Sequence, residues 1–461
     1  MVSDKVSQFA VGRTDGRLVT QRRLARARPP EPRGRGRLRG VSDSDEEYGE
    51  SIDAALKLEP SPSRAEADVR VHVGAHGSAP LAGYKVPPVA GLHDERPRED
   101  SGKMFERKCR ALRGEGRFHH MSPLLIDGDI SFGSGDFAER ARSTEADGYD
   151  GAWSAEVGHD PLLLLAGAAT ATTSLELGTG IVVAFGRSPM ITATMANDVQ
   201  LLSRGRLLLG LGSQIKPHIE KRYSMPWSHP AARMREYILA MRAIWSCWND
   251  GVKLDFRGEF YRHTLMTPFF NPGPNPFGPP RVFLAAVGGL MTEVAGEVGD
   301  GLLVHPFTTE RYLREVTMPA LGRGLEKAGR SIDGYQVSFS GLLATGSTES
   351  ELEAAKDAVR SQIAFYGSTP AYRGVLELHG WGELQTELNA LSRVGDWSTM
   401  ATLINDDVLS TFAVVGTIDE VPGLVHSRFG DVIDRFSLYT PYGLNDEHRR
   451  AIIAGLRAIS A

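Results

Sequence analysis

From about residue 121 onward, short apolar runs alternate with segments whose apolar residues recur at helical spacing. The apolar runs are continuous rather than alternating, which is typical of parallel strands that are covered on both faces. The pattern predicts strands at 124–127, 151–154, 175–183, 207–212, 282–286, 301–306, 335–344 and 435–440. It predicts helices at 136–147, 161–173, 189–203, 230–249, 289–298, 309–328 and 445–459, and a longer helical region at 348–411.

This alternation of strands and helices predicts an α/β fold, a (β/α)8 TIM barrel with insertions. The insertions are residues 251–280, which are rich in Pro, Gly and aromatic residues, and extra helices near 366–411. We expect these two segments to supply walls of a substrate pocket. The rival fold is an open, doubly wound sheet, which needs a glycine fingerprint after the first strand. Residues 124–137 contain no GxGxxG motif.

Residues 1–120 show no sustained apolar period, either of 3.6 residues as in a helix or of two residues as in a strand. The segment 22–40 is rich in Arg, Pro and Gly, and the segment 42–51 is acidic. Such a composition buries too little apolar surface to offset the entropy of the chain. We therefore predict that residues 1–120 are a disordered extension, or are included only because the start codon was assigned too far upstream. We predict that residues 121–461 are the functional domain. A tail that binds acidic partners is the alternative.

Composition narrows the class of protein. The chain has 461 residues, a formal net charge of −5 and two cysteines. No apolar run approaches the ~20 residues that cross a bilayer, so no membrane partner is predicted, and the first residues lack the apolar core of a secretory signal. Cys109 and Cys247 fit no disulfide or metal-binding pattern, which predicts a reducing cytoplasm. Because the residues after 120 are acidic in balance, we expect no nucleic-acid partner.

In a barrel of this kind, function lies at the carboxyl ends of the strands. The ionisable residues expected at this rim are Glu156, His159, Asp160, Lys216, His218 and His305. They form no nucleophile motif and have no metal-ligand spacing, so no metal site is predicted. An apolar, glycine-rich rim instead suits a large flat ligand that brings its own reactivity.

The segment 285-AAVGG-289 ends the fifth predicted strand with side chains so small that backbone is left exposed. A helix is predicted to begin there, with unpaired N–H groups and the positive end of its dipole. Together these features predict a cradle for an anion, such as a phosphate. The alternative is that the small residues only let this helix pack closely on the barrel.

Six segments, in this order and spacing, resemble the bacterial luciferase-like superfamily: 147-DGYDGAWSAE-156, 177-LGTGIVVAF-185, 203-SRGRLLLGLGSQ-214, 233-RMREYILAMRAIW-245, 282-VFLAAVGGLMTEVAGEVGDGLLVHPF-307 and 415-VGTIDEV-421. The resemblance is to the actinobacterial deazaflavin-dependent branch, the LLM-class oxidoreductases that use coenzyme F-420, and it covers about 120–460. It implies hydride transfer to or from a small organic substrate by a protein of a family in which homodimers are common. An FMN-dependent monooxygenase and a non-enzymatic flavin-binding protein are the alternatives.

The resemblance implies a non-prolyl cis peptide bond at Gly180–Ile181, on which the middle ring of the cofactor rests. It places further cofactor contacts at Gly178, Thr179, Val183, Gly212 and Ser213. It assigns the phosphate to Ala285, Ala286, Val287, Gly288 and Gly289, with His305 nearby, and an acidic cofactor tail to Lys216, Arg187 and Arg222.

The proton-transfer group is harder to assign, because the second strand ends in Ala155-Glu156 where some deazaflavin relatives have an Asp-His pair. The candidates, in order, are His159, Glu156 and His218. His159 could instead be a helix-capping or solvent-exposed residue, and Glu156 could pair with a nearby base. Asp160 precedes a proline and is predicted to cap a helix. The aromatic residues Trp153, Phe185, Trp227, Tyr439 and Tyr442 are candidates for pocket walls or for core packing.

Overall fold

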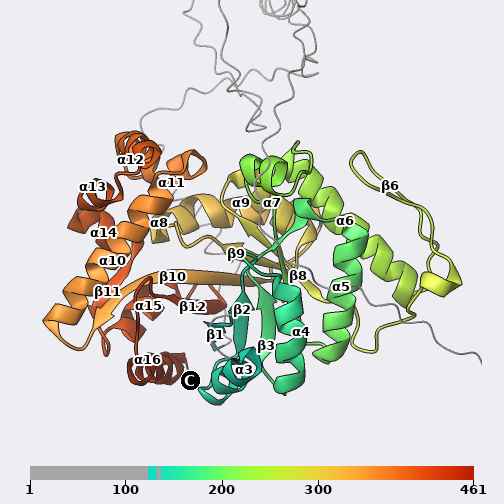
Figure 1. Ribbon diagram of the computed structural model, residues 1–461, viewed down its shortest axis with the longest axis horizontal. Coiled ribbons are helices and arrows are strands. Elements are labelled where there is room, and N and C mark those ends of the chain that lie inside the picture. Colours follow the sequence, from blue (N-terminus) through green and yellow to red (C-terminus); the bar gives the residue numbers. More distant parts are fainter. Residues whose placement is uncertain (1–122, 132–135, 461) are drawn as a thin grey trace, which may run out of the picture. The chain divides into compact units, whose positions relative to one another are not determined.

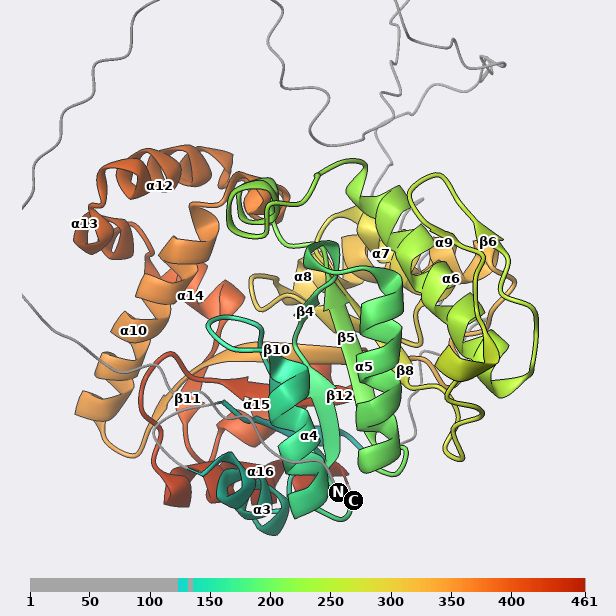
Figure 2. The same cartoon turned by 45° about the vertical axis from the view of Figure 1, so that its right-hand side comes forward.

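A computed structural model describes residues 123–131 and 136–460, and the predicted extension at 1–120 lies outside these residues. Within the described part, eight parallel strands close into a barrel (Figures 1 and 2). In barrel order they are β1 (Leu125–Asp129), β2 (Gly151–Ser154), β3 (Glu176–Thr179), β5 (Leu207–Gly212), β8 (Arg281–Ala286), β9 (Gly301–Val304), β10 (Gln336–Gly346) and β12 (Arg435–Tyr439). Pairing of β12 with both β10 and β1 completes the ring. The predicted TIM barrel is confirmed.

Helices follow the strands and cover the outside of the barrel (Figure 1). They are α3 (Phe137–Ala146), α4 (Pro161–Ala171), α5 (Pro189–Leu202), α6 (Pro230–Asn249), α7 (Gly289–Val298), α8 (Glu310–Tyr312), η5 (Leu313–Thr317), α9 (Met318–Lys327), α15 (Val421–Phe429) and α16 (Asp446–Ser460). Local chemistry sets several starts. Asp160 caps α4 by accepting from the backbone N–H groups of Leu162 and Leu163, and a proline occupies the first helical position. The predicted capping role of Asp160 is confirmed.

The inserted helices form a lobe that packs on the far end of β10. The lobe comprises α10 (Glu349–Gly367), η6 (Pro370–Tyr372), α11 (Arg373–Glu377), α12 (Gly382–Val394), α13 (Trp397–Thr402) and α14 (Asp406–Phe412). Strand β10 runs to Gly346, beyond its predicted end, and there pairs with β11 (Val414–Thr417), which the sequence analysis missed together with α15. A second hydrophobic core, which includes Leu342, Val359 and Phe412, joins the lobe to these two strands.

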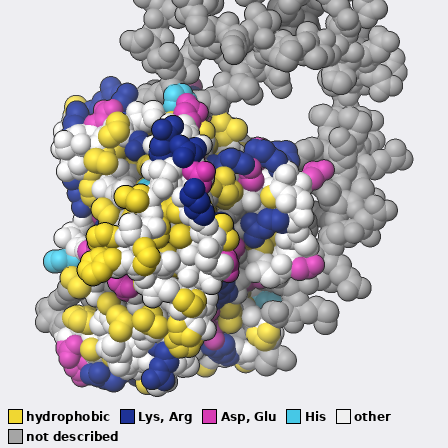
Figure 3. Space-filling view, turned by 90° about the vertical axis from the view of Figure 1, so that its right-hand side faces the viewer, with side chains coloured by type: hydrophobic (Ala, Val, Ile, Leu, Met, Phe, Trp, Pro, Cys, Tyr) yellow, Lys and Arg dark blue, Asp and Glu magenta, His cyan; other side chains and the backbone are white. Residues whose placement is uncertain are grey.

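The insertion at 251–280 lies on the outside of the barrel. It contains a short hairpin, β6 (Phe256–Arg257) and β7 (Arg262–His263), and the turn η4 (Pro268–Phe270). The Glu236 carboxylate on α6 accepts from three consecutive backbone N–H groups, at 259–261. Asn275 bonds Asn197 on α5. Apolar side chains gather on this side of the molecule (Figure 3). The contacts of this insertion are thus with α5 and α6, and a role as a pocket wall stays a prediction.

The amino-terminal half of the barrel is filled by a charged network. Arg435 is fully buried and bonds the Asp127 carboxylate through Nε and Nη2, at 2.8 and 2.6 Å. Glu176 pairs with both Arg435 and Arg281. Buried charges persist only when they are paired and hydrogen-bonded in this way. The network thus occupies the interior at the amino ends of the strands, and the predicted site lies at their carboxyl ends.

Trp153 lies inside the barrel directly above this network. Its indole N–H donates to Asp127 at 2.8 Å, and its ring packs edge-on against Phe283, with centroids 5.7 Å apart. A Cβ atom at Gly178 would lie 2.2 Å from the Trp153 ring. Gly178, predicted as a cofactor contact, therefore has a packing reason to be glycine.

The third strand is interrupted where it approaches the rim. The pairs Gly178–Leu208 and Val182–Leu211 enclose residues 179–181 on one strand and 209–210 on β5, so the first strand carries one extra residue. The predicted strand at 175–183 is thus split into β3 and β4 (Val182–Val183). The peptide bond Gly180–Ile181 lies in this bulge and is cis, which confirms the backbone geometry that the resemblance implied.

The Thr179 hydroxyl replaces the ladder bonds that the bulge removes. It accepts from the Gly210 N–H at 2.8 Å and donates to the Gly210 carbonyl at 2.8 Å, in a fully buried position. Both backbone groups of Gly210 would otherwise be buried without a partner. Thr179, predicted as a cofactor contact, therefore ties β3 to β5.

We predict that Thr179→Val, which keeps the shape but removes the hydroxyl, lowers the free energy of unfolding by about 1–3 kcal/mol, because two buried backbone groups lose their partner. Urea unfolding of the wild type, Thr179→Val and Thr179→Ser measures this. Thr179→Ser keeps the hydroxyl and serves as the control. Equal stability of Thr179→Val and wild type would contradict this role.

Candidate active site

The carboxyl ends of the parallel strands bring most of the predicted site residues to one end of the barrel, which we call the mouth. The bulge reaches it with Gly180 exposed and Ile181 partly exposed. Strand β5 ends beside the bulge in Gly212, followed by Ser213, and a Cβ atom at Gly212 would lie 2.6 Å from the end of the Ile181 side chain. Glycine at 212 thus leaves room for Ile181 to lie along the mouth.

Glu156 holds the bulge in place from behind. Its Oε2 accepts from the Val183 N–H at 2.9 Å, and its Oε1 accepts from the Tyr223 hydroxyl and pairs with Arg187 Nη2, both at 2.8 Å. Arg187 also pairs with Asp160 at 2.7 Å. Both carboxylate oxygens are therefore engaged, which favours the ion-pair alternative over proton transfer by Glu156.

The same contacts bear on two further expectations. The side chains of Val182 and Val183 are fully buried, so Ile181 and the backbone of the bulge are what face the mouth. The Arg187 side chain is 14% exposed and carries two carboxylates. Arg187 is therefore not available to bind an acidic cofactor tail, contrary to the expectation from the resemblance.

The turn between β8 and α7 exposes bare backbone. Gly288 caps α7 without any side-chain hydrogen bond. A Cβ atom at Gly288 or Gly289 would meet no atom within 4 Å, whereas one at Gly296 in the same helix would lie 2.4 Å from the Leu321 carbonyl oxygen. Close helix packing therefore explains Gly296 but not the pair at the turn. The space beside that pair, with the open N–H groups of α7, suits an anion.

A small pocket lies beside this turn and contains a buried polar atom without a partner. Its lining residues are Ala286, Val287, Val304, His305, Phe307, Thr308, Tyr312 and Thr317. The hydroxyl of Thr308 is buried and bonds no other described residue. Buried hydroxyls are nearly always hydrogen-bonded, so this one points to a polar group that binds here. No sequence motif marked Thr308.

His305 is neutral and its tautomer follows from its contacts. Its Nδ1 accepts from the Phe307 backbone N–H at 3.0 Å, so the ring proton is on Nε2, which lies 3.1 Å from the Tyr372 hydroxyl. Burial lowers the pKa of His305 to about 4. His305 can therefore stand near a phosphate as a neutral group, but it adds no positive charge at neutral pH.

The remaining predicted residues lie at the edge of the mouth. His159 is exposed on the loop between β2 and α4, Lys216 is exposed after β5, and His218 is exposed on the turn η3 (His218–Arg222). Arg222 donates to the Val157 carbonyl at 2.6 Å. The Ser213 hydroxyl donates to the Gln214 carbonyl at 3.1 Å. None of these contacts blocks a role with a ligand.

Some of the aromatic residues predicted as pocket walls or core lie in the core, and others lie at the rim of the barrel. Phe185 is fully buried and packs edge-on against Trp227, with centroids 5.6 Å apart, so it belongs to the core. The Tyr439 hydroxyl lies 3.0 Å from that of Tyr366, a lobe residue that the sequence analysis missed. Tyr223 and Tyr372 were missed as well, because nothing in their spacing shows which way they face.

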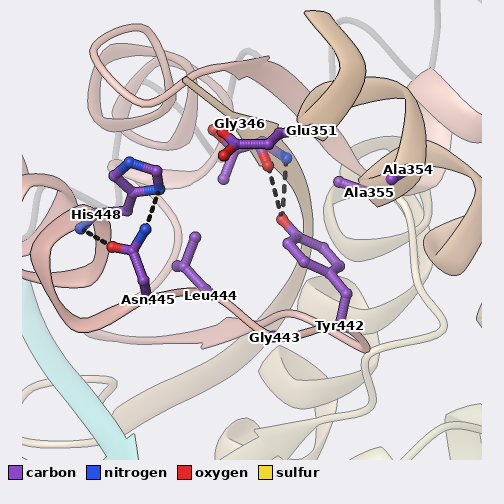
Figure 4. Close-up of a pocket in the computed structure, with 10 residues that line it drawn as sticks. Gly346, Glu351, Ala354, Ala355, Tyr442, Gly443, Leu444, Asn445 and His448 are labelled. Carbon is purple, nitrogen blue, oxygen red and sulfur yellow. Dashed lines mark hydrogen bonds between the residues drawn. The ribbon is translucent and has the colours of Figure 1, made fainter. Parts of the chain in front are cut away.

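A larger pocket lies between the end of β10 and the starts of α10 and α16 (Figure 4). Here the Tyr442 hydroxyl bonds the Thr345 backbone, and Asn445 bonds His448. None of the predicted cofactor or catalytic residues lines it.

Within 123–131 and 136–460, no group of three or more His, Cys, Asp or Glu side chains is placed to hold a metal ion. In the same residues, no helix is both long and apolar enough to span a bilayer.

Comparisons with known proteins agree with this geometry. The sequence profile of the family described as luciferase-like monooxygenase matches residues 117–432. An uncharacterized protein of Mycobacterium tuberculosis is 55% identical over 312 residues, which are 68% of this chain and 92% of that protein. The 5,10-methylenetetrahydromethanopterin reductase of Archaeoglobus fulgidus is 30% identical over 258 residues, 54% of this chain and 72% of the reductase.

A solved structure shares the fold. The coenzyme F-420-dependent tetrahydromethanopterin reductase of Methanopyrus kandleri superposes with a TM-score of 0.59. The superposition covers 73% of this chain and 99% of the reductase, at 20% sequence identity. At this identity the likeness establishes the shared barrel and nothing finer.

The low pKa of His305 predicts an acid-sensitive contribution to stability. Between about pH 6.5 and 4 the unfolded imidazole binds a proton that the buried one does not, so stability falls as pH falls through this window. NMR titration of the imidazole should give a pKa near 4, and His305→Phe should flatten the loss of unfolding free energy in this window. A measured pKa near 6.5 would contradict the burial argument.

Proposed function

Because this chain belongs to the luciferase-like monooxygenase family, we propose that it is an oxidoreductase that binds coenzyme F-420 at the barrel mouth. It transfers a hydride to or from a small organic substrate. The observation that carries the proposal is the open glycine pair, Gly288 and Gly289, which the packing of the protein does not require. The exposed backbone at Gly180–Ile181 supplies a second surface for the same ligand. Only strand β5 lies between this bulge, which follows β3, and β8, which leads into the glycine pair.

The residues at the mouth fit a phosphate-bearing tricyclic cofactor. The bulge at 180–181 would support the ring, and Gly212 and Ser213 would lie beside it. The turn 285–289, the first N–H groups of α7 and the unpartnered Thr308 hydroxyl would hold the phosphate. Lys216 and Arg222 are exposed cations that could bind an acidic tail. The deazaflavin, when bound, supplies the hydride chemistry, and the chain supplies position and a wall of low dielectric constant.

The choice of cofactor rests on relatives rather than on the mouth itself. A 30% identical relative is named a methylenetetrahydromethanopterin reductase, and a reductase of related name is described as coenzyme F-420-dependent. An FMN-dependent monooxygenase would use the same backbone surfaces and is supported by the description of the family. Oxygen consumption coupled to product formation would favour FMN. A protein that binds either cofactor but turns over no donor would be a flavin-binding protein without activity.

Among the predicted proton-transfer groups, His159 stays first. Both carboxylate oxygens of Glu156 are engaged by Val183, Tyr223 and Arg187. His159 is exposed on the loop that follows β2, at the edge of the mouth. A general acid or base must reach the reacting group, and an exposed imidazole at the mouth is accessible to a substrate. His218 is the further candidate.

We predict that Gly288→Leu and Gly289→Leu each weaken binding of coenzyme F-420 by roughly tenfold or more, while the fold persists because a Cβ atom at either position meets no protein atom within 4 Å. Fluorescence titration measures the affinity, and circular dichroism checks the fold. Gly322→Leu is the matched control, since a Cβ at Gly322 on α9 also meets nothing within 4 Å. Unchanged affinity in both rim variants would remove the proposed phosphate site.

We predict that His159→Ala lowers turnover roughly 10²–10⁴-fold and leaves the affinity for coenzyme F-420 near that of the wild type, as expected for loss of a proton-transfer group. Reduction of the coenzyme with a panel of alcohols and sugar phosphates measures turnover. His448→Ala, which changes a histidine of the pocket in Figure 4, is the control. Full activity of His159→Ala, or equal loss of turnover and affinity, would exclude His159.

A further inference from the structure

The lobe places aromatic side chains against the barrel rim. Tyr366 on α10 and Tyr372 on η6 lie against His305, with ring centroids 5.0 and 4.5 Å from the imidazole. Tyr366 also reaches Tyr439 at the end of β12, with the two hydroxyl oxygens 3.0 Å apart. All four residues are partly exposed. We call His305, Tyr366, Tyr372 and Tyr439 the aromatic wall.

The proton of the Tyr372 hydroxyl is uncommitted. Because Nδ1 of His305 accepts from a backbone N–H, Nε2 of the neutral ring carries the proton and donates to the Tyr372 oxygen. Tyr372 therefore accepts from His305 and must direct its own O–H elsewhere. No described residue lies within hydrogen-bond reach to take it, which leaves an oriented donor at the wall.

The pair Tyr366–Tyr439 has a second uncommitted proton. One hydroxyl donates to the other, so the accepting tyrosine keeps its own O–H. Burial raises the pKa of both Tyr366 and Tyr372, so these hydroxyls keep their protons at neutral pH. With His305 neutral, no member of the wall offers a positive charge.

The wall stands across the mouth from the bulge. In barrel order β9, which leads into His305, and β12, which ends in Tyr439, flank β10. Strand β10 is four strands from β3 in either direction, so it lies opposite β3 and the Gly180–Ile181 bulge. A flat ligand that rests on the bulge would therefore present its other face toward the wall.

We propose that the aromatic wall binds the substrate, and that Tyr372, with the Tyr366–Tyr439 pair, donates hydrogen bonds to a carbonyl oxygen of that substrate. An uncharged donor set suits a neutral acceptor, whereas a substrate carboxylate would find no counter-charge among the wall residues. His305 is a positioning residue that orients Tyr372. The proposal rests on the proposed function only in taking the barrel mouth as the site of reaction.

The test is infrared spectroscopy of cyclohexanone, labelled with ¹³C at its carbonyl, bound to the full chain loaded with oxidised coenzyme F-420. Loss of a hydrogen bond moves a carbonyl band to higher frequency. We expect this movement in Tyr372→Phe and Tyr366→Phe, together with a roughly 2- to 10-fold loss of ketone affinity. Tyr442→Phe, whose hydroxyl already bonds the Thr345 backbone outside the wall, should leave the band in place.

Identical bands in wild type and both wall variants would overturn the proposal, as would the absence of any bound ketone in the wild type.

A second experiment tests whether the acceptor oxygen belongs to the phosphate of the cofactor instead of the substrate. If Tyr372→Phe weakens coenzyme F-420 but not its chromophore lacking the phosphate, the hydroxyl serves the cofactor and the proposal fails while the proposed function stands. If the wild type binds neither F-420 nor FMN, the proposed function fails, and the ketone band of the cofactor-free chain still tests the wall.

Discussion

One extra residue between β3 and β5 is the constraint on which the mouth depends. The strands of a closed barrel must pair along their length, and this insertion leaves the backbone of Gly210 without its ladder partners. A threonine hydroxyl restores both bonds below the bulge, and the Glu156 carboxylate accepts from the Val183 backbone N–H of β4 above it. The Gly180 N–H also donates to the Ser154 carbonyl and the Ile181 carbonyl accepts from the Glu156 N–H, so the bulge is held in place while Gly180 remains exposed.

The two ends of the barrel solve different physical problems. At the amino ends of the strands, paired carboxylates and guanidinium groups fill the interior, and Trp153 covers them. At the carboxyl ends, β5 finishes in Gly212 and β8 in Ala286, and the buried hydroxyl of Thr308 has no partner among the described residues. Buried charges are tolerated when each has a partner, as at the amino ends. A buried polar group without a partner, such as the Thr308 hydroxyl, would be stabilised by a hydrogen bond to a ligand. Stability and binding are thus separated along one axis.

Sequence periodicity was sufficient for the barrel but not for the site. Strand 207–212 and helices 230–249 and 289–298 were predicted with the bounds that the structure shows, because apolar runs and prolines or glycines mark their ends. The region 348–411 was predicted as helical, yet β11 and α15 after it were missed, because their apolar runs are short. For the cofactor contacts, the cis bond at 180–181 followed from the resemblance. The partners of Glu156, and the tyrosines of the wall, come from segments far away in the chain, and periodicity does not tell which distant side chains meet.

We propose that the bare backbone of the mouth binds a deazaflavin through its ring and its phosphate. Calorimetric titration of the full chain with coenzyme F-420, with the same chromophore lacking the phosphate, and with FMN tests it most directly. We expect saturable binding of one coenzyme F-420 per chain, weaker binding of the chromophore alone, and binding of FMN that is weaker than that of F-420. Absence of binding by all three ligands, or equal affinity with and without the phosphate, would contradict it.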